Sequence, residues 1–413
     1  MSNSSPVLVS NHCLRKQAVA RMAAQHGAFM YPFGMRLALV SVYDPADVNQ
    51  WSGIPSFVLN ELRAQVEHLE VIPPLSRSFR YWYSAQGLRS KITGNKIQID
   101  RRQGFLDSYA RQIERALLNK NVDGILALSS IPISHLKRGL PVIFWTDAVY
   151  EAMAGYYAGS FSNLTSSELT IAHAQEQAAL DRSSFAVYSS SWAAQATLRL
   201  YDSPEEKIKV VHFGANLSPV HDTRSVERFV EERLQGECSL LFLGVDWERK
   251  GGPIALEATR ILNDRGIKTR LKVVGCDAPS APFVDNLGFI SKRTAAGKLE
   301  IERLLKSSTF LLFPTRAEAA GIVLCEACAF GLPVVSTSTG GVESYVAEGE
   351  TGYCLPLSAT PAQYADIIQY LLEYPNQYRR LAMNAFDLYK RRLNWSFGVA
   401  QIISLFESQK VVK

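Results

Sequence analysis

The stretch TFLLFPTRAEAAGIVLCEACAFGLPVVS, residues 309–336, decides which fold the sequence predicts. Residues 309–313 are a short apolar run closed by a proline, which is typical of a buried strand. A polar turn over 315–321 follows, and the next residues predict a helix from Ile322 to Phe330 that a glycine and a proline end. Residues 333–336 form the next expected strand. This order of strand, turn, helix and strand predicts an open α/β sheet.

Two glutamates occupy defined places in this pattern. Glu318 follows the carboxyl end of the first strand, and Glu326 lies in the second turn of the helix. Ligands bind at that edge of an open α/β sheet, where the start of the helix offers unpaired N–H groups to anions. Gly340 and Gly341 predict a second turn, which leads into another helix. We therefore expect a ligand site built around Glu318 and Glu326.

The two glutamates have seven residues between them and are framed by Gly321 and by Gly331-Leu332-Pro333. This pattern resembles the signature of family 4 glycosyltransferases, which are retaining enzymes of GT-B fold that use nucleotide-sugar donors. The resemblance covers nearly all of residues 35–397 and implies two Rossmann-like domains facing one another across a cleft. The alternative is that Glu318 is a surface acid and that Glu326 caps a helix or forms a salt bridge.

The composition fits a two-domain globular protein. At 413 residues the chain is too long for one core, and 47% of its residues are hydrophobic and 20% charged. No apolar run approaches the roughly 18 residues of a membrane-spanning helix. The cysteines lack disulfide or zinc spacing and are interpreted as buried thiols of a cytoplasmic protein. They are Cys13, Cys238, Cys276, Cys325, Cys328 and Cys354.

Basic residues are concentrated in one segment, residues 77–102. The net charge of this segment is +6, while that of the whole chain is +5, so the remaining residues carry a net charge of −1. Because the basic character is local, it argues against a general nucleic-acid binder. Aromatic residues are interleaved with the cations, a combination that suits an anionic acceptor or the inner face of a membrane. The alternative is an ordinary insertion whose aromatic side chains pack on the domain.

Three parts of the chain are expected. Residues 1–34 are polar, without a regular apolar period, and are predicted to be a poorly ordered extension. Residues 35–217, together with a returning helix within 392–413, are expected to form the acceptor-side domain. Residues 218–391 are expected to form the donor-binding domain, because this part carries the two glutamates.

Two positions of the first domain are candidates for the site. The turn before a predicted helix from Phe57 to Gln65 contains Gly53, whose backbone N–H is placed to meet donor phosphates if the resemblance holds. A second strand ends in Thr146-Asp147, where many relatives have a histidine that places the acceptor. Asp147 is therefore a candidate catalytic residue on the acceptor side, and a helix N-cap is its alternative role.

A turn near the start of the second domain carries two adjacent cations, Arg249 and Lys250, followed by two glycines. Lysine and free N–H groups in such a turn suit a diphosphate. In the resembled family a Lys-Gly here binds the donor diphosphate, usually with an arginine just after the preceding strand. Val245 stands at that arginine's place, so Arg249 is expected to substitute for it. The alternative is two solvated cations on a loop.

The resemblance also implies the remaining donor contacts. Glu326 would bind ribose hydroxyls, Glu318 would bind the donor sugar, and Phe289 and Ile290 would hold the base. The helix start at Gly321, Ile322 and Val323 would add partial positive charge beside the departing diphosphate. No resident cofactor and no metal are expected, since the nucleotide sugar is a co-substrate.

The expected function is transfer of a sugar, with retention, to a glycan, glycolipid or polysaccharide precursor. The sequence identifies neither the sugar nor the base. One rival is a nucleotide-sugar epimerase of the same fold, which would act without an acceptor. A rival of another class is a non-catalytic binding protein, against which the intact glutamate pair and Lys250 speak.

Overall fold

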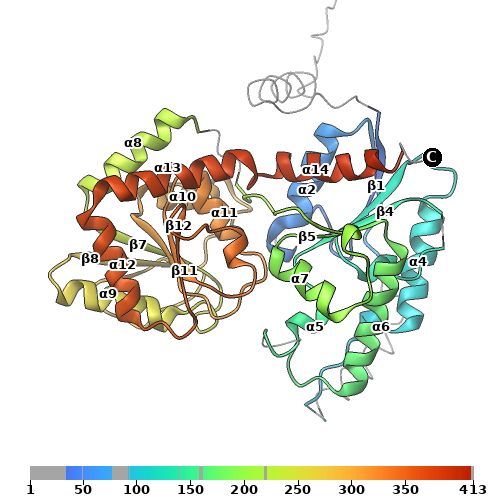
Figure 1. Ribbon diagram of the computed structural model, residues 1–413, viewed down its shortest axis with the longest axis horizontal. Coiled ribbons are helices and arrows are strands. Elements are labelled where there is room, and N and C mark those ends of the chain that lie inside the picture. The colour runs from blue at the N-terminus through green and yellow to red at the C-terminus, as the bar shows by residue number, and fades with distance from the viewer. Residues whose placement is uncertain are drawn as a thin grey trace, which may run out of the picture.

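The computed structural model shows two α/β domains side by side (Figure 1). It describes residues 34–48, 50–76, 92, 94–137, 139–157, 161–217 and 221–410. The predicted disordered extension therefore lies, but for its last residue, outside the described residues, as does most of the basic segment 77–102. None of the helices in the described ranges combines the length and apolar character needed to cross a bilayer.

The first domain is built on a six-stranded, parallel sheet in the order β2-β1-β3-β4-β5-β6. Its strands are β1 (Arg36–Val40), β2 (His68–Val71), β3 (Gly124–Ala127), β4 (Val142–Thr146), β5 (Phe185–Tyr188) and β6 (Ile208–Val210). Its helices are α2 (Ile54–Gln65), α4 (Gln103–Ala116), α5 (Tyr150–Met153), α6 (Ser166–Arg182) and α7 (Ser191–Leu200).

The second domain repeats this plan with a parallel sheet in the order β12-β11-β10-β7-β8-β9. Its strands are β7 (Cys238–Leu243), β8 (Thr269–Val274), β9 (Val284–Asn286), β10 (Phe310–Phe313), β11 (Val334–Thr337) and β12 (Gly352–Leu355). Its helices are α8 (Thr223–Gln235), α9 (Gly252–Asp264), α10 (Ala295–Ser307), α11 (Ile322–Ala329), α12 (Pro361–Glu373) and α13 (Pro375–Arg391). The α/β fold predicted from residues 309–336 is thus confirmed.

The order of the second sheet explains why its loops after β7 and β10 meet. The chain runs outward from β7 to β8 and β9 on one side, and from β10 to β11 and β12 on the other. β7 and β10 are direct neighbours, with Leu240 opposite Phe310 and Leu241 opposite Leu311. The loops at their carboxyl ends therefore leave the sheet on either side of a topological switch point, where open α/β sheets bind ligands.

The last helix, α14 (Trp395–Ser408), returns to the first domain and packs on α2. Figure 1 shows α13 and α14 in succession along one side of both domains. Trp395 stacks on Phe57 of α2, with ring centroids 6.5 Å apart, and its indole N–H donates to Asn216 at 2.8 Å. Gly214 is required here, because a Cβ at this position would lie 2.3 Å from the Trp395 nitrogen.

Three expectations about helices are wrong: two concern boundaries and one concerns a helix that does not form. α2 begins at Ile54, before the predicted Phe57, because Gly53 adopts φ 86° and a proline follows at the first turn. The apolar period predicts a helix over 171–180, but α6 runs from Ser166 to Arg182, since the Thr165 hydroxyl caps it by accepting the Glu168 N–H. The turn at Gly340 and Gly341 leads only into a single 3-10 turn, Val342–Ser344.

Candidate active site

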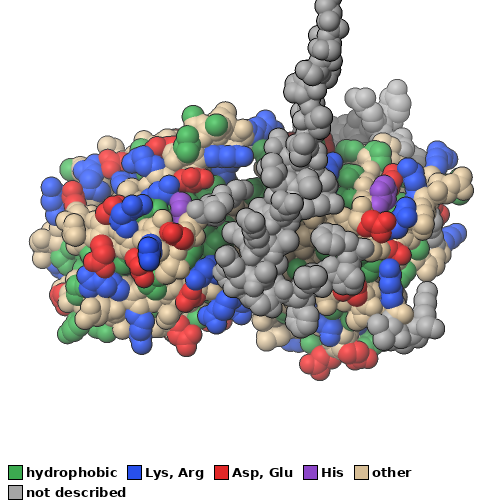
Figure 2. Space-filling model, turned by 90° about the horizontal axis from the view of Figure 1, so that it is seen from above, with side chains coloured by type: hydrophobic (Ala, Val, Ile, Leu, Met, Phe, Trp, Pro, Cys, Tyr) green, Lys and Arg blue, Asp and Glu red, His purple; other side chains and the backbone are tan. Residues whose placement is uncertain are grey.

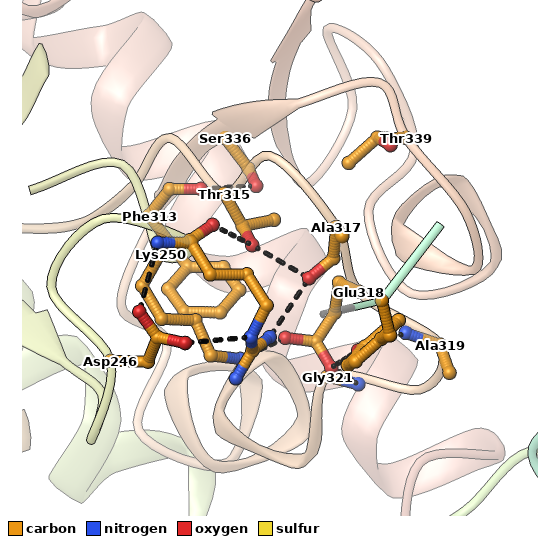
Figure 3. Close-up of polar contacts among 12 residues, drawn as sticks. Asp246, Lys250, Phe313, Thr315, Ala317, Glu318, Ala319, Gly321, Ser336 and Thr339 are labelled. Atoms are coloured by element: carbon orange, nitrogen blue, oxygen red, sulfur yellow. Dashed lines mark hydrogen bonds and ion pairs between the residues drawn. The ribbon is translucent and has the colours of Figure 1, made fainter. Parts of the chain in front are cut away.

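Glu318 and Lys250 meet at the switch point of the second sheet (Figure 3). Glu318 lies on the loop after β10 and Lys250 on the loop after β7, and the Lys250 ammonium forms an ion pair with Glu318 Oε2. The ammonium also lies over the Phe313 ring, 4.7 Å from its centroid. Both side chains are largely buried, and burial lowers the pKa of Lys250, an effect that the Glu318 charge opposes.

The backbone of the Glu318 loop is held tightly by two glycine turns. Gly321, at φ 64°, is the N-cap of α11, and its N–H donates to Glu318 Oε1 at 3.1 Å. The Gly341 N–H donates to the Glu318 carbonyl at 2.9 Å. A Cβ on Gly340 would lie 2.1 Å from the same carbonyl oxygen, so this turn admits no side chain. The glycines thus allow one segment of backbone to pack against another.

Glu326 is almost completely buried, with 1% of its surface exposed, and it forms an ion pair with Lys292. Lys292 lies on the loop between β9 and α10. The sequence reasoning missed this lysine, although it follows the predicted base-binding Phe289 and Ile290 by two residues. Each member of the glutamate pair is therefore paired with a lysine from a different loop.

Arg249 turns toward the Glu318 loop. It donates to the Ala317 carbonyl at 2.9 Å, lies 3.3 Å from Asp246 and stacks over the Tyr157 ring, with its guanidinium carbon 4.9 Å from the centroid. The side chain of Arg249 is 21% exposed and that of Lys250 is 13% exposed. The alternative of two solvated loop cations is therefore wrong.

Asp147 follows β4 and accepts a hydrogen bond from the indole N–H of Trp51 at 3.1 Å. The helix N-cap role is wrong, because α5 begins at Tyr150 with Val149 as its N-cap. Burial raises the pKa of Asp147, and the charge of Glu318 in the other domain raises it further. The structure thus brings Asp147 close enough to Glu318 for their charges to interact.

Gly53 belongs to a strained turn at the first sheet's edge. Its φ is 86°, and the two residues before it, Trp51 and Ser52, also have positive φ values of 44° and 56°. The Asn216 side-chain amide donates to the Ser52 carbonyl and holds the turn in place. Strained backbone angles at residues other than glycine are concentrated at functional sites. Here the strained residue Trp51 is the one that donates to Asp147.

The remaining predicted donor residues differ in exposure. Phe289 is 72% exposed, which leaves its ring available to a ligand, whereas Ile290 packs partly against the core. Gly321 is buried, and Ile322 and Val323 at the start of α11 are partly exposed. The described part of the chain contains no group of three or more His, Cys, Asp or Glu side chains arranged to hold a metal ion.

Two tyrosines of the first domain also reach this site. Tyr156 and Tyr157 follow α5 and contact the backbone of Glu318 and Ala319. Nothing in the sequence around them indicated this role, because the contact joins residues about 160 positions apart. The site therefore includes side chains from both domains.

Comparison with known proteins finds similarity in the part of the chain that carries Lys250, Glu318 and Glu326. Residues 223–387 match the family described as glycosyl transferases group 1. Over 252 residues the chain is 28% identical to the D-inositol 3-phosphate glycosyltransferase of Corynebacterium glutamicum (strain R), covering 56% of this chain and 59% of that protein. Over 277 residues it is 25% identical to the lipopolysaccharide glucosyltransferase WaaG of Escherichia coli (strain K12), covering 63% of this chain and 71% of that protein.

The chain spans about half the length of other curated relatives that it matches. Among solved structures, it is similar to sucrose-phosphate synthase (tll1590) from Thermosynechococcus elongatus, with a TM-score of 0.63 and 16% identity. That match covers 92% of this chain and 100% of the other. The likeness extends over both domains and establishes the fold.

Proposed function

We propose that the chain is a group 1 glycosyltransferase of GT-B fold that moves a sugar from a nucleotide-sugar donor to a glycan, glycolipid or polysaccharide precursor. The observation that carries the proposal is the Lys250–Glu318 ion pair beside the start of α11. It combines a cation for a diphosphate with a carboxylate for sugar hydroxyls at the edge where such sheets bind ligands.

Lys250 and the N-terminus of α11 would stabilise the diphosphate as it leaves. The ammonium has three N–H donors, so it can bond a phosphate oxygen while it stays close to Glu318. Ile322 and Val323 present backbone N–H groups there, and the helix adds partial positive charge. Arg249, held over Tyr157, adds a second cation nearby. Positive charge that is already in place is worth more in a buried site than in water.

Glu326 and Lys292 would together hold the ribose and its adjoining phosphate. Glu326 is buried, so its bonds to ribose hydroxyls would be charge-assisted and poorly screened. Lys292 balances that carboxylate and keeps a third of its side chain exposed, which leaves donors for the ligand. The exposed Phe289 ring would stack on the base, with Ile290 packed beneath the same loop.

Asp147 would bind the acceptor hydroxyl opposite the donor sugar. Its raised pKa favours the protonated acid, and perturbed acids of this kind gather at functional sites. The strained turn at Gly53 holds Trp51 against Asp147 and would keep the carboxyl group aimed at the acceptor. Transfer with retention would then need no protein nucleophile, because the leaving phosphate takes the proton of the acceptor. The proposal includes no resident cofactor or metal.

Segment 77–102 would contact an acidic membrane surface or an anionic acceptor. Among its basic residues that the structure describes, Arg101 pairs with Glu176 at 2.7 Å and Arg102 pairs with Glu168. Elsewhere, on the face in Figure 2, acidic and basic side chains lie interspersed over the second domain. A variant with charges reversed between 77 and 96 should no longer sediment with acidic vesicles; unchanged sedimentation and unchanged acceptor KM would defeat this part.

The activity is tested by incubating the purified protein with a panel of nucleotide sugars, with and without a cell extract as the source of acceptor. Diphosphate release that depends on the extract supports transfer. Inversion of the sugar without an acceptor would identify the epimerase instead. If neither occurs, a non-catalytic binding protein of the same fold is the better description.

A further inference from the structure

Tyr156 and Tyr157 connect the first domain to the backbone of the Glu318 loop. Tyr156 Oη accepts the Glu318 N–H at 3.0 Å and lies 2.9 Å from Thr339 Oγ1. Tyr157 Oη accepts the Ala319 N–H at 3.0 Å and donates to Glu318 Oε1 at 3.5 Å. Two consecutive amides of the second domain are thus bonded by two consecutive side chains of the first.

These contacts complete the fixation of the peptide between Glu318 and Ala319. The carbonyl of this peptide, that of Glu318, accepts the Gly341 N–H at 2.9 Å, and the Glu318 carboxylate is held by Lys250 and Gly321. The fit is close, because a Cβ on Gly340 would lie 2.3 Å from Tyr156 Oη. Among the described residues, the bonds to this peptide and to the Glu318 N–H that come from the opposite domain are those of the two tyrosines.

The tyrosines themselves are held by neighbouring side chains. The Tyr156 ring packs on Trp192 of α7, with centroids 5.2 Å apart, and the Tyr157 ring lies under Arg249. The preceding helix α5 is anchored by Tyr150, whose ring lies 4.3 Å from the Arg101 guanidinium carbon. Tyr156 is thus held within the first domain by Trp192, whereas the Tyr157 ring also contacts the second domain through Arg249.

We infer that Tyr156 and Tyr157 are positioning residues that give the Glu318 loop its reactive geometry when the two domains meet. This inference rests on the proposed function. Glu318 is oriented through its backbone by the first domain, which also carries Asp147 on the acceptor side. Assembly of the donor-sugar site is thereby coupled to the domain that binds the acceptor.

Removing the two tyrosine hydroxyl groups should slow sugar transfer without weakening the binding of the nucleotide. Y156F and Y157F keep both rings but leave the amides of Glu318 and Ala319 unbonded. The nucleoside diphosphate would contact Lys250, Lys292, Glu326 and α11, all in the second domain, so its affinity should stay constant. We expect kcat to fall roughly fivefold for each variant and at least tenfold for the double variant.

The test uses Y156F, Y157F, the double variant, and Y370F as a control on the exposed surface of α12. It measures kcat and donor KM in the parent's acceptor-dependent reaction, calorimetric affinity for the nucleoside diphosphate, and hydrogen exchange at the Glu318 and Ala319 amides. Lower kcat, unchanged diphosphate affinity and faster exchange at those amides support the inference. Unchanged hydrogen exchange at the two amides would overturn the inference. An unchanged or increased kcat would also overturn it, and an increase would mean that the hydroxyl groups obstruct the donor.

The exchange measurement separates this inference from the proposed function. It needs no turnover, so it reports on the tyrosine contacts even if the parent releases no diphosphate from any donor. In that case the proposed function fails, while faster exchange in the variants still supports the positioning role. A melting temperature close to that of the parent excludes general unfolding as the cause.

Discussion

Lys292 of the loop after β9 and Glu326 of α11 form an ion pair that links the predicted base-binding segment to the second glutamate of the pair. Glu326 is 1% exposed, and a buried carboxylate without a partner costs several kcal/mol or takes up a proton. Lys292 therefore balances a carboxylate charge in the interior of the protein. In each of the two Lys–Glu pairs the lysine charge offsets the glutamate charge.

Lys292→Met should destabilise the protein more than Glu326→Gln does, because it leaves the buried carboxylate alone. We expect a loss of about 2 kcal/mol in the free energy of unfolding at neutral pH, measured by urea denaturation. Adding Glu326→Gln to Lys292→Met should recover most of that loss. Lys298→Met, at an exposed position of α10, serves as the control. Additive losses in the double variant would show that the pair contributes nothing.

Glu326→Gln and Glu318→Gln should affect different steps. Glu326 is proposed to bind the ribose, so loss of a charge-assisted hydrogen bond should weaken binding of the nucleoside diphosphate roughly ten- to a hundredfold. Glu318 is proposed to bind the donor sugar, so loss of its charge should lower kcat and leave diphosphate binding as in the parent. Calorimetry and steady-state kinetics on both variants separate these effects. If Glu318→Gln is the variant that fails to bind, the two roles are assigned wrongly.

Asp147→Asn should stabilise the protein and lower the rate of sugar transfer. Because the native pKa of Asp147 is raised, the native state loses stability as pH rises from the usual aspartate pKa through the raised value. At neutral pH the parent therefore has a lower free energy of unfolding because of Asp147. Asparagine can still accept the hydrogen bond from the Trp51 indole N–H but has no such loss. The gain in melting temperature should be largest at neutral pH and disappear in acid. A lower melting temperature at neutral pH would contradict this.

Arg233 should prove essential to the position of α11. It is buried in α8 and donates to four carbonyls, those of Leu305, Lys306, Phe330 and Gly331, at 2.6–2.9 Å. These acceptors end α10 and α11, so Arg233→Met leaves them without a partner and should cost roughly 3 kcal/mol in unfolding free energy. Arg228→Met, on the exposed side of the same helix, is the control. Equal urea midpoints for both variants would disprove this role.

The parts of the fold that depend on local sequence were predictable. The apolar run at 310–313, the glycine before α11 and the proline after it mark a strand, a turn and a helix, and the parallel order of such elements places Glu318 and Lys250 at one edge. Periodicity alone missed the ends of α2 and α6, because a strained glycine turn and a threonine cap determined them.

The contacts that were missed join residues distant in sequence. Three of these residues lie on loops, namely Lys292, Tyr156 and Tyr157. Tertiary packing determines which residues they contact, and no local sequence pattern predicts those contacts. Arg233 was overlooked because an arginine in an amphipathic helix normally faces water, whereas here the ends of two helices surround it. The predicted disorder of residues 1–34 lies, but for Gly34, outside the described residues and stays a prediction.

Calorimetric titration of a nucleoside diphosphate into the parent and into Lys250→Ala tests most directly whether the Lys250–Glu318 centre is the donor site. The parent should bind the diphosphate, and the variant should bind it at least roughly tenfold more weakly, because it loses a charge-assisted bond to phosphate. Lys268→Ala, at an exposed position of the same domain, should bind like the parent. Equal affinity of Lys250→Ala and the parent would contradict the placement of the diphosphate at this centre.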